Sequence, residues 1–327
     1  MHVPMVPPGS VRADGSGAAE STDRVVICNP VSGSEDHLEQ VHGLAADGGW
    51  KLRVTEAEGD AREYAREAAE SGTELVAAAG GDGTVNEVVD GFVDSGVEDW
   101  PTLLIVPAGT GNNTASNLGI ESIGEAFSLA ESGRRRRLDL GRANDRAFLN
   151  SCIGGLTAEA SLETDSESKR RFGVLAYVLK TIETATNYDG APLRVTLENA
   201  DVATSVVWEG DVALAFIGNC RRFGRRQAQA HAEDGLLEVT LVENASMPSM
   251  VGATALDHLF DLDADGIVRH RVPRVTIESL HDEPITYSLD GEVLAAEELD
   301  LETLPGAISV VVGDDYESNP DAEGAGL

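Results

Sequence analysis

A run of five apolar residues, 75–79 (LVAAA), leads directly into the glycine-rich segment 80–84 (GGDGT). A buried strand that ends at glycines and feeds a helix is a typical phosphate-binding arrangement. Glycines let the backbone approach an anion, and the N–H groups that open the helix point toward it. Thr84 and Glu87 have the spacing of a capping box, so we expect the helix to begin at Val85. The segment indicates a nucleotide-phosphate site, with a glycine-rich turn that binds no ligand as the alternative.

Strand-like and helix-like segments alternate along the first part of the chain. We expect strands at 25–28, 52–54, 74–79 and 103–106, and helices at 35–46, 60–71 (with Asp60 as N-cap) and 85–93. Continuous apolar strands separated by helices predict a parallel sheet that is covered on both faces. Ligands of such sheets bind at the carboxyl ends of the strands, so segments 29–33, 80–84 and 107–112 should meet at one edge.

The pattern changes after about residue 139. Apolar and polar residues alternate at 193–197, 237–241 and 275–277, which predicts antiparallel strands, and one helix is expected at about 169–186. The predicted fold class is therefore α/β, with an N-terminal Rossmann-like parallel-sheet nucleotide domain and a C-terminal, mostly antiparallel domain.

The charge of the chain excludes some partners. The 327 residues carry a net charge of −33, and Lys51, Lys169 and Lys180 are its only lysines. Such a surface repels nucleic acid, which needs a basic footprint, and also repels anionic membranes. Because the acidic residues are spread along the chain, we interpret them as an adaptation to high salt, where charge repulsion is screened.

The cysteines and the chain ends suggest a cytoplasmic protein. The three cysteines, Cys28, Cys152 and Cys220, lie far apart and form no Cys-x-x-Cys pair, which argues against a zinc site or a disulfide framework. No apolar run has the length of a membrane span, and residues 1–23 lack the pattern of a secretory signal. We expect 1–23 to be a disordered arm and 314–327 a flexible tail.

Four motifs in a fixed order give the most specific signal. They are residues 29–33 (NPVSG), 80–88 (GGDGTVNEV), 107–112 (PAGTGN) and 290–292 (DGE). In this order they resemble the diacylglycerol kinase catalytic family, the ATP-dependent lipid kinases that include bacterial diacylglycerol kinases and sphingosine kinases. The resemblance covers about residues 24–313.

This resemblance implies two domains with the active site in the cleft between them. Residues 24–139 would form the nucleotide-binding α/β domain, completed by a last strand at about 306–313. Residues 140–305 would form a β-sandwich domain that binds the lipid substrate.

The resemblance also implies which residues bind ATP and Mg²⁺. Thr84 would donate its hydroxyl to the phosphates, and Asp82 would hold Mg²⁺ directly or through water. The full set of implied nucleotide contacts is Asn29, Ser32, Gly33, Thr55, Gly80, Gly81, Asp82, Gly83, Thr84, Val85, Asn86, Thr110 and Asn112. For an isolated threonine among these, ordinary turn or cap chemistry would be the better interpretation.

The implied catalytic pair is Glu292 and Asp290. Phosphoryl transfer needs a carboxylate that orients the acceptor hydroxyl and takes its proton, and the family places this base at the Glu of Asp-Gly-Glu. Glu292 is therefore the predicted base and Asp290 its supporting partner. Taken alone, Asp290-Gly291 would instead predict a β-hairpin turn.

Two further sites are implied. A structural Mg²⁺ would be held by the carboxylate of Asp234 and the backbone carbonyls of His231 and Leu236, with an Asp-Gly turn as the alternative. Asp139 would join the metal–water network near ATP, or would be only a charged residue in the interdomain link.

The sequence departs from the family pattern in three places. Asn113 stands where the family has an aspartate, which removes one charge from the metal network, and Ser116 replaces a common arginine. Residues 221–226 (RRFGRR) replace a glycine-rich stretch. These arginines could contact a phosphate or lipid head group, but pairing with nearby carboxylates in a solvated network is the favoured interpretation, as it is for 134–137.

The predicted function is transfer of the γ-phosphoryl group from ATP to a hydroxyl of a lipid alcohol, such as a diacylglycerol-like or ether-linked glycerolipid or a sphingoid. This would require transient peripheral contact with a membrane. The alternatives are a soluble-substrate kinase of the NAD kinase type and a non-catalytic nucleotide-binding regulator. The sequence leaves the oligomeric state open, a homodimer included.

Overall fold

The N-terminal part of the computed structural model contains a parallel sheet. The structure describes residues 23–33, 37–155, 190–199, 205–221, 229–244, 266–281 and 283–320. Five strands follow one another in the order β2-β1-β3-β4-β15, and every pairing among them is parallel. Their bounds are β1 (Arg24–Cys28), β2 (Lys51–Val54), β3 (Leu75–Gly80), β4 (Thr102–Pro107) and β15 (Glu298–Val312). Because β3 and β4 are buried along their whole length, they read as continuous apolar runs.

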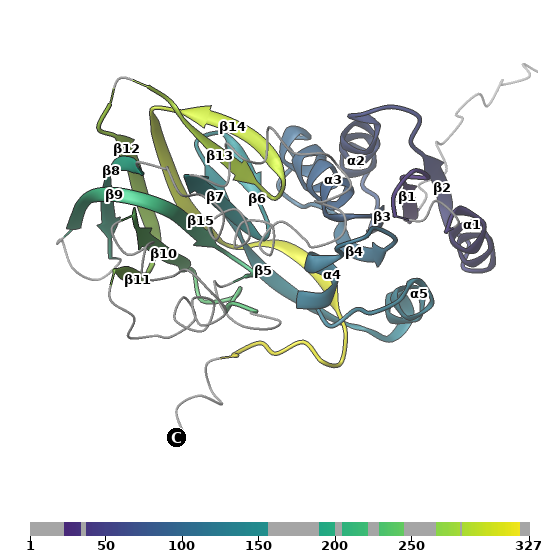
Figure 1. The fold of residues 1–327 in the computed structure, drawn as a ribbon. Helices are drawn as coiled ribbons and strands as arrows, with labels where there is room; N and C mark the ends of the chain where they lie inside the picture. Colours follow the sequence, from purple (N-terminus) through teal and green to yellow (C-terminus); the bar gives the residue numbers. More distant parts are fainter. Residues whose placement is uncertain are drawn as a thin grey trace, which may run out of the picture.

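Helices cover this sheet on both sides. Helices α2 and α3 lie together on one side, while α1 and α5 pack together on the other (Figure 1). The helices are α1 (Leu38–Asp47), α2 (Asp60–Glu70), α3 (Asp82–Asp94), α4 (Asn113–Asn117) and α5 (Ile123–Ser132). None of the helices in the described ranges has the length and apolar character needed to cross a membrane.

The second part of the chain is antiparallel. Its strands pair in the order β14-β13-β7-β9-β8-β12-β15, and β10 and β11 extend from β9. In addition, β5 pairs with β15 and with β6. The bounds are β5 (Arg134–Ala143), β6 (Arg146–Phe148), β7 (Ser151–Gly155), β8 (Ala191–Glu198), β9 (Ser205–Gly218), β10 (Leu237–Glu243), β11 (Ile267–Val272), β12 (Arg274–Ser279), β13 (Ile285–Leu289) and β14 (Glu292–Ala296). The α/β fold class with a parallel N-terminal and an antiparallel C-terminal part is thus confirmed.

Strands β5 and β15 join the two parts. The first half of β15 pairs antiparallel with β12, and its second half lies parallel to β4, with Val310 opposite Leu103. Both strands run through the boundaries expected at 139/140 and 305/306, so the two parts share strands instead of meeting at a linker (Figure 1). Two apolar cores result, one under the parallel sheet and one within the antiparallel part.

The start of α3 differs from the expected capping box. The helix begins at Asp82, and the hydroxyl of Thr84 accepts a hydrogen bond from Asn29 Nδ2 at 3.3 Å instead of capping the helix. Burial raises the pKa of Glu87, and the backbone N–H groups of Gly59, Ala61 and Arg62 at the start of α2 oppose this rise. Glu87 therefore faces the start of the neighbouring helix α2. Because α3 begins at Asp82, the prediction of a helix start at Val85 was wrong.

Asp60 also differs from its expected role. The N-cap of α2 is Gly59, which has φ +87°, a conformation that favours glycine. Asp60 is the first helical residue, and its carboxylate accepts from the backbone N–H groups of Glu56 and Ala57 at 2.7 and 2.9 Å. The helix expected at 169–186 and the arm at 1–22 lie outside the described residues.

The buried carboxylate of Asp139 fixes β15 against its surroundings. One oxygen accepts from the backbone N–H of Gly306 and the other from that of Gly235, both at 2.7 Å. Burial raises the pKa of Asp139, although the two N–H groups oppose this shift by favouring the charged form. Asp139 thus connects three segments distant in sequence: β5, the loop 231–236 and the bend in β15.

We predict that Asp139→Ala destabilises the fold by about 2–4 kcal/mol, because two buried backbone donors lose their acceptor. The free energy of unfolding from urea titration at neutral pH measures this. Asp145→Ala is the matched control, since Asp145 is exposed in the turn between β5 and β6, and it should change stability by less than about 0.5 kcal/mol. Equal effects of the two substitutions would contradict the role of Asp139.

Candidate active site

The carboxyl ends of β1, β3 and β4 meet as expected, and glycines permit their contact. A Cβ atom on Gly109 would overlap with the Cα atom of Gly81, so these two loops touch backbone to backbone. Gly33 has φ +56°, and a Cβ there would lie 2.6 Å from the carbonyl oxygen of Ala108. Larger side chains at these positions would push the three loops apart.

A pocket of about 450 Å³ lies between these loops, and we call it the glycine-loop pocket. Of the expected nucleotide contacts, eight line it: Asn29, Ser32, Gly33, Gly81, Asp82, Gly83, Thr84 and Thr110. The other five, Thr55, Gly80, Val85, Asn86 and Asn112, do not. The other described lining residues are Val31, Glu87, Gly109, Gly111 and Asn113, and none of the described lining residues is cationic.

Some of the expected contacts have structural roles of their own. Asn112 closes the turn after β4, because its side chain accepts from the backbone N–H of Gly109 at 2.8 Å and donates to the Gly109 carbonyl at 2.9 Å. Gly80 leaves room for Thr84, since a Cβ at position 80 would overlap with the threonine hydroxyl. Asn86 is 2% exposed, and its amide has no hydrogen-bond partner among the described residues.

Asp82 organises the start of α4. Its carboxylate accepts from the backbone N–H groups of Asn113 and Thr114 at 3.1 and 2.9 Å, and from the Thr114 hydroxyl at 2.8 Å. The Asn113 amide also donates to Asp82, at 3.2 Å. An ionised aspartate at position 113 could not donate this hydrogen bond and would repel the carboxylate of Asp82. Asn113 therefore replaces a repulsion between two carboxylates with a hydrogen bond.

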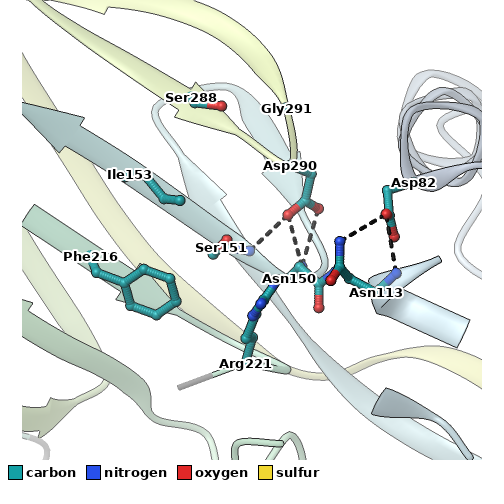
Figure 2. Close-up of a pocket in the computed structure, with 10 residues that line it drawn as sticks. All are labelled: Asp82, Asn113, Asn150, Ser151, Ile153, Phe216, Arg221, Ser288, Asp290 and Gly291. Atoms are coloured by element: carbon teal, nitrogen blue, oxygen red, sulfur yellow. Dashed lines mark hydrogen bonds between the residues drawn. The ribbon is translucent and has the colours of Figure 1, made fainter. Parts of the chain in front are cut away.

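A second, smaller pocket of about 50 Å³ lies next to the first, and we call it the inner pocket (Figure 2). It brings together carboxylates, amides and one cation from both parts of the chain. It is lined by Asp82, Asn113, Asn150, Ser151, Ile153, Phe216, Arg221, Ser288, Asp290 and Gly291.

Asp290 occupies the turn that ends in this pocket. Asp290 and Gly291, with φ +46° and +101°, form the two-residue turn between β13 and β14, so the hairpin interpretation of these residues is correct. The carboxylate accepts from the backbone N–H groups of Leu149, Asn150 and Ser151, the first at 2.6 Å and the last at 2.7 Å (Figure 2). Burial raises its pKa to about 6, against the opposing effect of these donors.

Glu292 points into a third pocket, of about 480 Å³, which we call the outer pocket. Its carboxylate is paired with Arg146, which also lies 3.4 Å from the carboxylate of Asp90 on α3. Arg146 and Asp90 were not found from the sequence, because nothing in their local pattern marks them. The outer pocket is lined by Glu58, Gly59, Arg62, Glu87, Asp90, Gly291, Glu292 and Val293.

The three pockets adjoin one another. The glycine-loop and inner pockets share Asp82 and Asn113, the inner and outer pockets share Gly291, and the outer and glycine-loop pockets share Glu87. Asp290 and Glu292, which lie on either side of Gly291, therefore face two different pockets beside one glycine-rich site.

Asp82 and Asp290 are the carboxylates that could hold Mg²⁺. They line the same inner pocket, and Mg²⁺ is usually bound by one or two carboxylates together with water and phosphate oxygens. Within the described ranges no group of three or more His, Cys, Asp or Glu side chains forms a metal cluster. The donor set therefore fits a metal that arrives with a phosphate ligand.

In the loop 231–236, the structural Mg²⁺ site stays a prediction, and the carboxylate of Asp234 has other partners in the structure. One oxygen of Asp234 accepts from the backbone N–H of Leu236 at 3.0 Å, and the other is paired with the guanidinium of Arg271. Asp139 contacts this loop and β15, and it lines none of the three pockets.

The two arginine clusters have different surroundings. Arg136 pairs with Glu233, while Arg134 and Arg137 donate to the backbone carbonyls of Gly313 and Gly306. Arg221, in contrast, lies in the inner pocket, so a solvated network does not describe it. The remaining residues of its cluster, 222–226, are outside the described ranges.

The raised pKa of Asp290 predicts a pH dependence of stability. A carboxyl whose pKa is higher in the folded chain binds its proton more tightly there, so its contribution to the free energy of unfolding falls as pH rises through that range. Asp290→Asn removes this titration. The difference in free energy of unfolding, variant minus wild type, should therefore rise by about 2–3 kcal/mol from about pH 4 to about pH 7.

Urea titrations across this pH range measure the effect, with Asp145→Asn at an exposed position as the control. A difference between Asp290→Asn and wild type that stays constant with pH would mean that Asp290 has an ordinary pKa.

Comparisons with known proteins agree with the geometry. Residues 23–143 match the family model of the diacylglycerol kinase catalytic domain, and residues 150–312 match that of the YegS C-terminal NAD kinase beta sandwich-like domain. A Salmonella arizonae protein named "Probable lipid kinase YegS" is 31% identical over 302 residues, 89% of this chain and 96% of that protein. A protein of the same name from Escherichia coli O9:H4 (strain HS) is 30% identical over 298 residues, also 89% and 96%.

Solved structures give the same result. A crystal structure from Bacillus anthracis str. Sterne, described as a "putative diacylglycerol kinase", matches with a TM-score of 0.77 and 27% identity over 92% of this chain and 99% of that one. Both the sequence and the fold are thus similar to these proteins over nearly their whole length. The chain belongs to the diacylglycerol kinase catalytic family of lipid kinases.

Proposed function

We propose that this chain is an ATP-dependent lipid kinase, which transfers the γ-phosphoryl group of ATP to a hydroxyl of a lipid alcohol. One observation carries the proposal: a glycine-rich pocket at the ends of parallel strands adjoins the pockets of Asp290 and Glu292. The triphosphate would lie in the glycine-loop pocket, where backbone N–H groups and hydroxyls supply its hydrogen bonds.

Glu292 would orient the acceptor hydroxyl in the outer pocket and take its proton. Arg146 is a positioning residue in this scheme, because it holds the Glu292 carboxylate next to Asp90 at the interface between α3 and the β13–β14 hairpin. Magnesium, held by Asp82 and Asp290 with the phosphates, would neutralise negative charge on the transferred group.

Two alternatives each have an observation in their favour. The C-terminal family model is described as NAD kinase-like, which keeps a soluble acceptor such as NAD open. Asn113, in place of an aspartate, would fit a nucleotide-binding regulator without activity. We favour the lipid kinase because the named relatives match along nearly their full length.

A lipid acceptor requires contact with a membrane. The net charge of −33 disfavours an anionic bilayer, so we propose that this contact is transient and peripheral. The homodimer stays a prediction.

We predict that Glu292→Gln lowers kcat by about 10²-fold or more, because an amide cannot accept the hydroxyl proton. Transfer of radiolabel from [γ-³²P]ATP to extracted lipid alcohols, in the presence of Mg²⁺, measures this. Glu297→Gln, at an exposed position on the far end of the same hairpin, is the matched control and should keep the parent rate. A Glu292→Gln variant as fast as the parent would defeat this mechanism.

The same assay separates the proposed substrates. Label that enters a lipid fraction supports the lipid kinase, and label that enters NAD but no lipid would assign the soluble alternative. A chain that binds the nucleotide and labels neither acceptor would be the regulator.

A further inference from the structure

The proposed site contains a cationic side chain, Arg221, that has no role in the scheme of phosphoryl transfer given above. Among the residues that the structure describes, Arg221 is the only cationic side chain lining the inner pocket, and no described cation lines the glycine-loop pocket. In the outer pocket, Arg62 already donates to Asp94 at 2.5 Å. Arg221 is therefore the cation available to an anion that reaches from the glycine loops toward Asp290.

The backbone holds Arg221 in this position. Asn219, which is fully buried, donates through its side chain to the carbonyls of Asp139 and Leu149, both at 2.8 Å. A Cβ atom on Gly218 would overlap with the carbonyl oxygen of Arg221, so the chain folds back tightly at the end of β9. The side chain is thus presented by a rigid segment and extends into the pocket toward Asn150 (Figure 2).

The surroundings of Arg221 favour an anionic ligand. Among the described residues, its guanidinium has no hydrogen bond and no carboxylate within ion-pair distance. Burial lowers its pKa, while the charges of Asp82 and Asp290 act from further away to raise it. A partly buried guanidinium without a direct partner offers its donors to a ligand, and its planar fork matches phosphate oxygens.

We propose that Arg221 binds the γ-phosphoryl group of the nucleotide and holds it in the inner pocket between Asp82 and Asp290. This rests on the proposed function. As the bond from the γ-phosphorus to the bridging oxygen breaks, its electron pair stays on ADP. The new bond forms to the acceptor oxygen, whose proton passes to Glu292. Arg221 stabilises the charge on the three γ-oxygens during this transfer.

The test compares nucleotides with and without a γ-phosphate. Calorimetry with Mg²⁺ gives the dissociation constants of ADP and of the non-hydrolysable analogue AMP-PNP for wild type and for Arg221→Gln. In the variant, the dissociation constant of AMP-PNP should rise by about tenfold or more and that of ADP should change by less than about threefold, since one charge-assisted contact to the γ-phosphate is lost. Its kcat should fall by about 10²-fold or more.

Two further variants make the test specific. Arg221→Lys keeps the positive charge but loses the planar fork of the guanidinium. Its preference for AMP-PNP over ADP should therefore lie between those of wild type and Arg221→Gln. The lysine variant also provides the test if the glutamine variant fails to fold. Arg194→Gln is the matched control, because Arg194 lies half-buried on β8, outside the three pockets, and pairs with Glu209. It should keep wild-type affinities for both nucleotides.

The outcomes separate the two proposals. If wild type binds both nucleotides and the Arg221 variants keep its preference for AMP-PNP, the role of Arg221 is wrong and the kinase proposal stands. If the Arg221 variants bind ADP and AMP-PNP more weakly by the same factor, the role of Arg221 is also wrong, since the lost contact would not involve the γ-phosphate. If wild type binds neither nucleotide, the proposed function fails.

Discussion

Hydrogen bonding along β15 determines where both halves of the site lie. Its N-terminal half belongs to the antiparallel part and its C-terminal half to the parallel sheet, so the two parts cannot shift independently without breaking this strand. The carboxylate of Asp139 holds the bend at Gly306, where the pairing register shifts between Leu304 and Ile308. The turn at Asp290 is thereby kept opposite the glycine loops, although more than 200 residues separate it from Asp82.

The Asp290-Gly291 turn shows that structural and functional interpretations of a motif need not exclude each other. The left-handed backbone of Asp290 forms the hairpin, and the same turn directs its carboxylate into three backbone N–H groups in the inner pocket. Burial keeps the pKa of this group high, so its charge is sensitive to a nearby cation. Glu292, two residues later, faces the neighbouring pocket, which gives one turn two acidic groups in different environments.

Local patterns predicted what depends on local physics. The apolar strands, the glycine-marked strand ends and the family resemblance are confirmed, because alternation and glycine conformations act over a few residues. The capping box failed because Glu87 reaches another helix, and Arg146 was missed because its partners, Asp90 and Glu292, are brought to it only by the tertiary fold. Arg221 was assigned to a solvated surface for the same reason: a run of arginines carries no information on which of them is enclosed.

The scarcity of cations at the site sets a limit on how this chain handles a triphosphate. The described lining of the glycine-loop pocket includes Asp82 and Glu87 but no arginine or lysine, so in the proposed function N–H groups, hydroxyls and a metal would hold the phosphates. A chain with a net charge of −33 also repels a polyanion such as ATP over a long range, and salt screens this repulsion. High salt would therefore favour nucleotide approach as well as solubility. A short-range guanidinium inside the inner pocket is screened much less, which is why one enclosed arginine can matter more there than several on the surface.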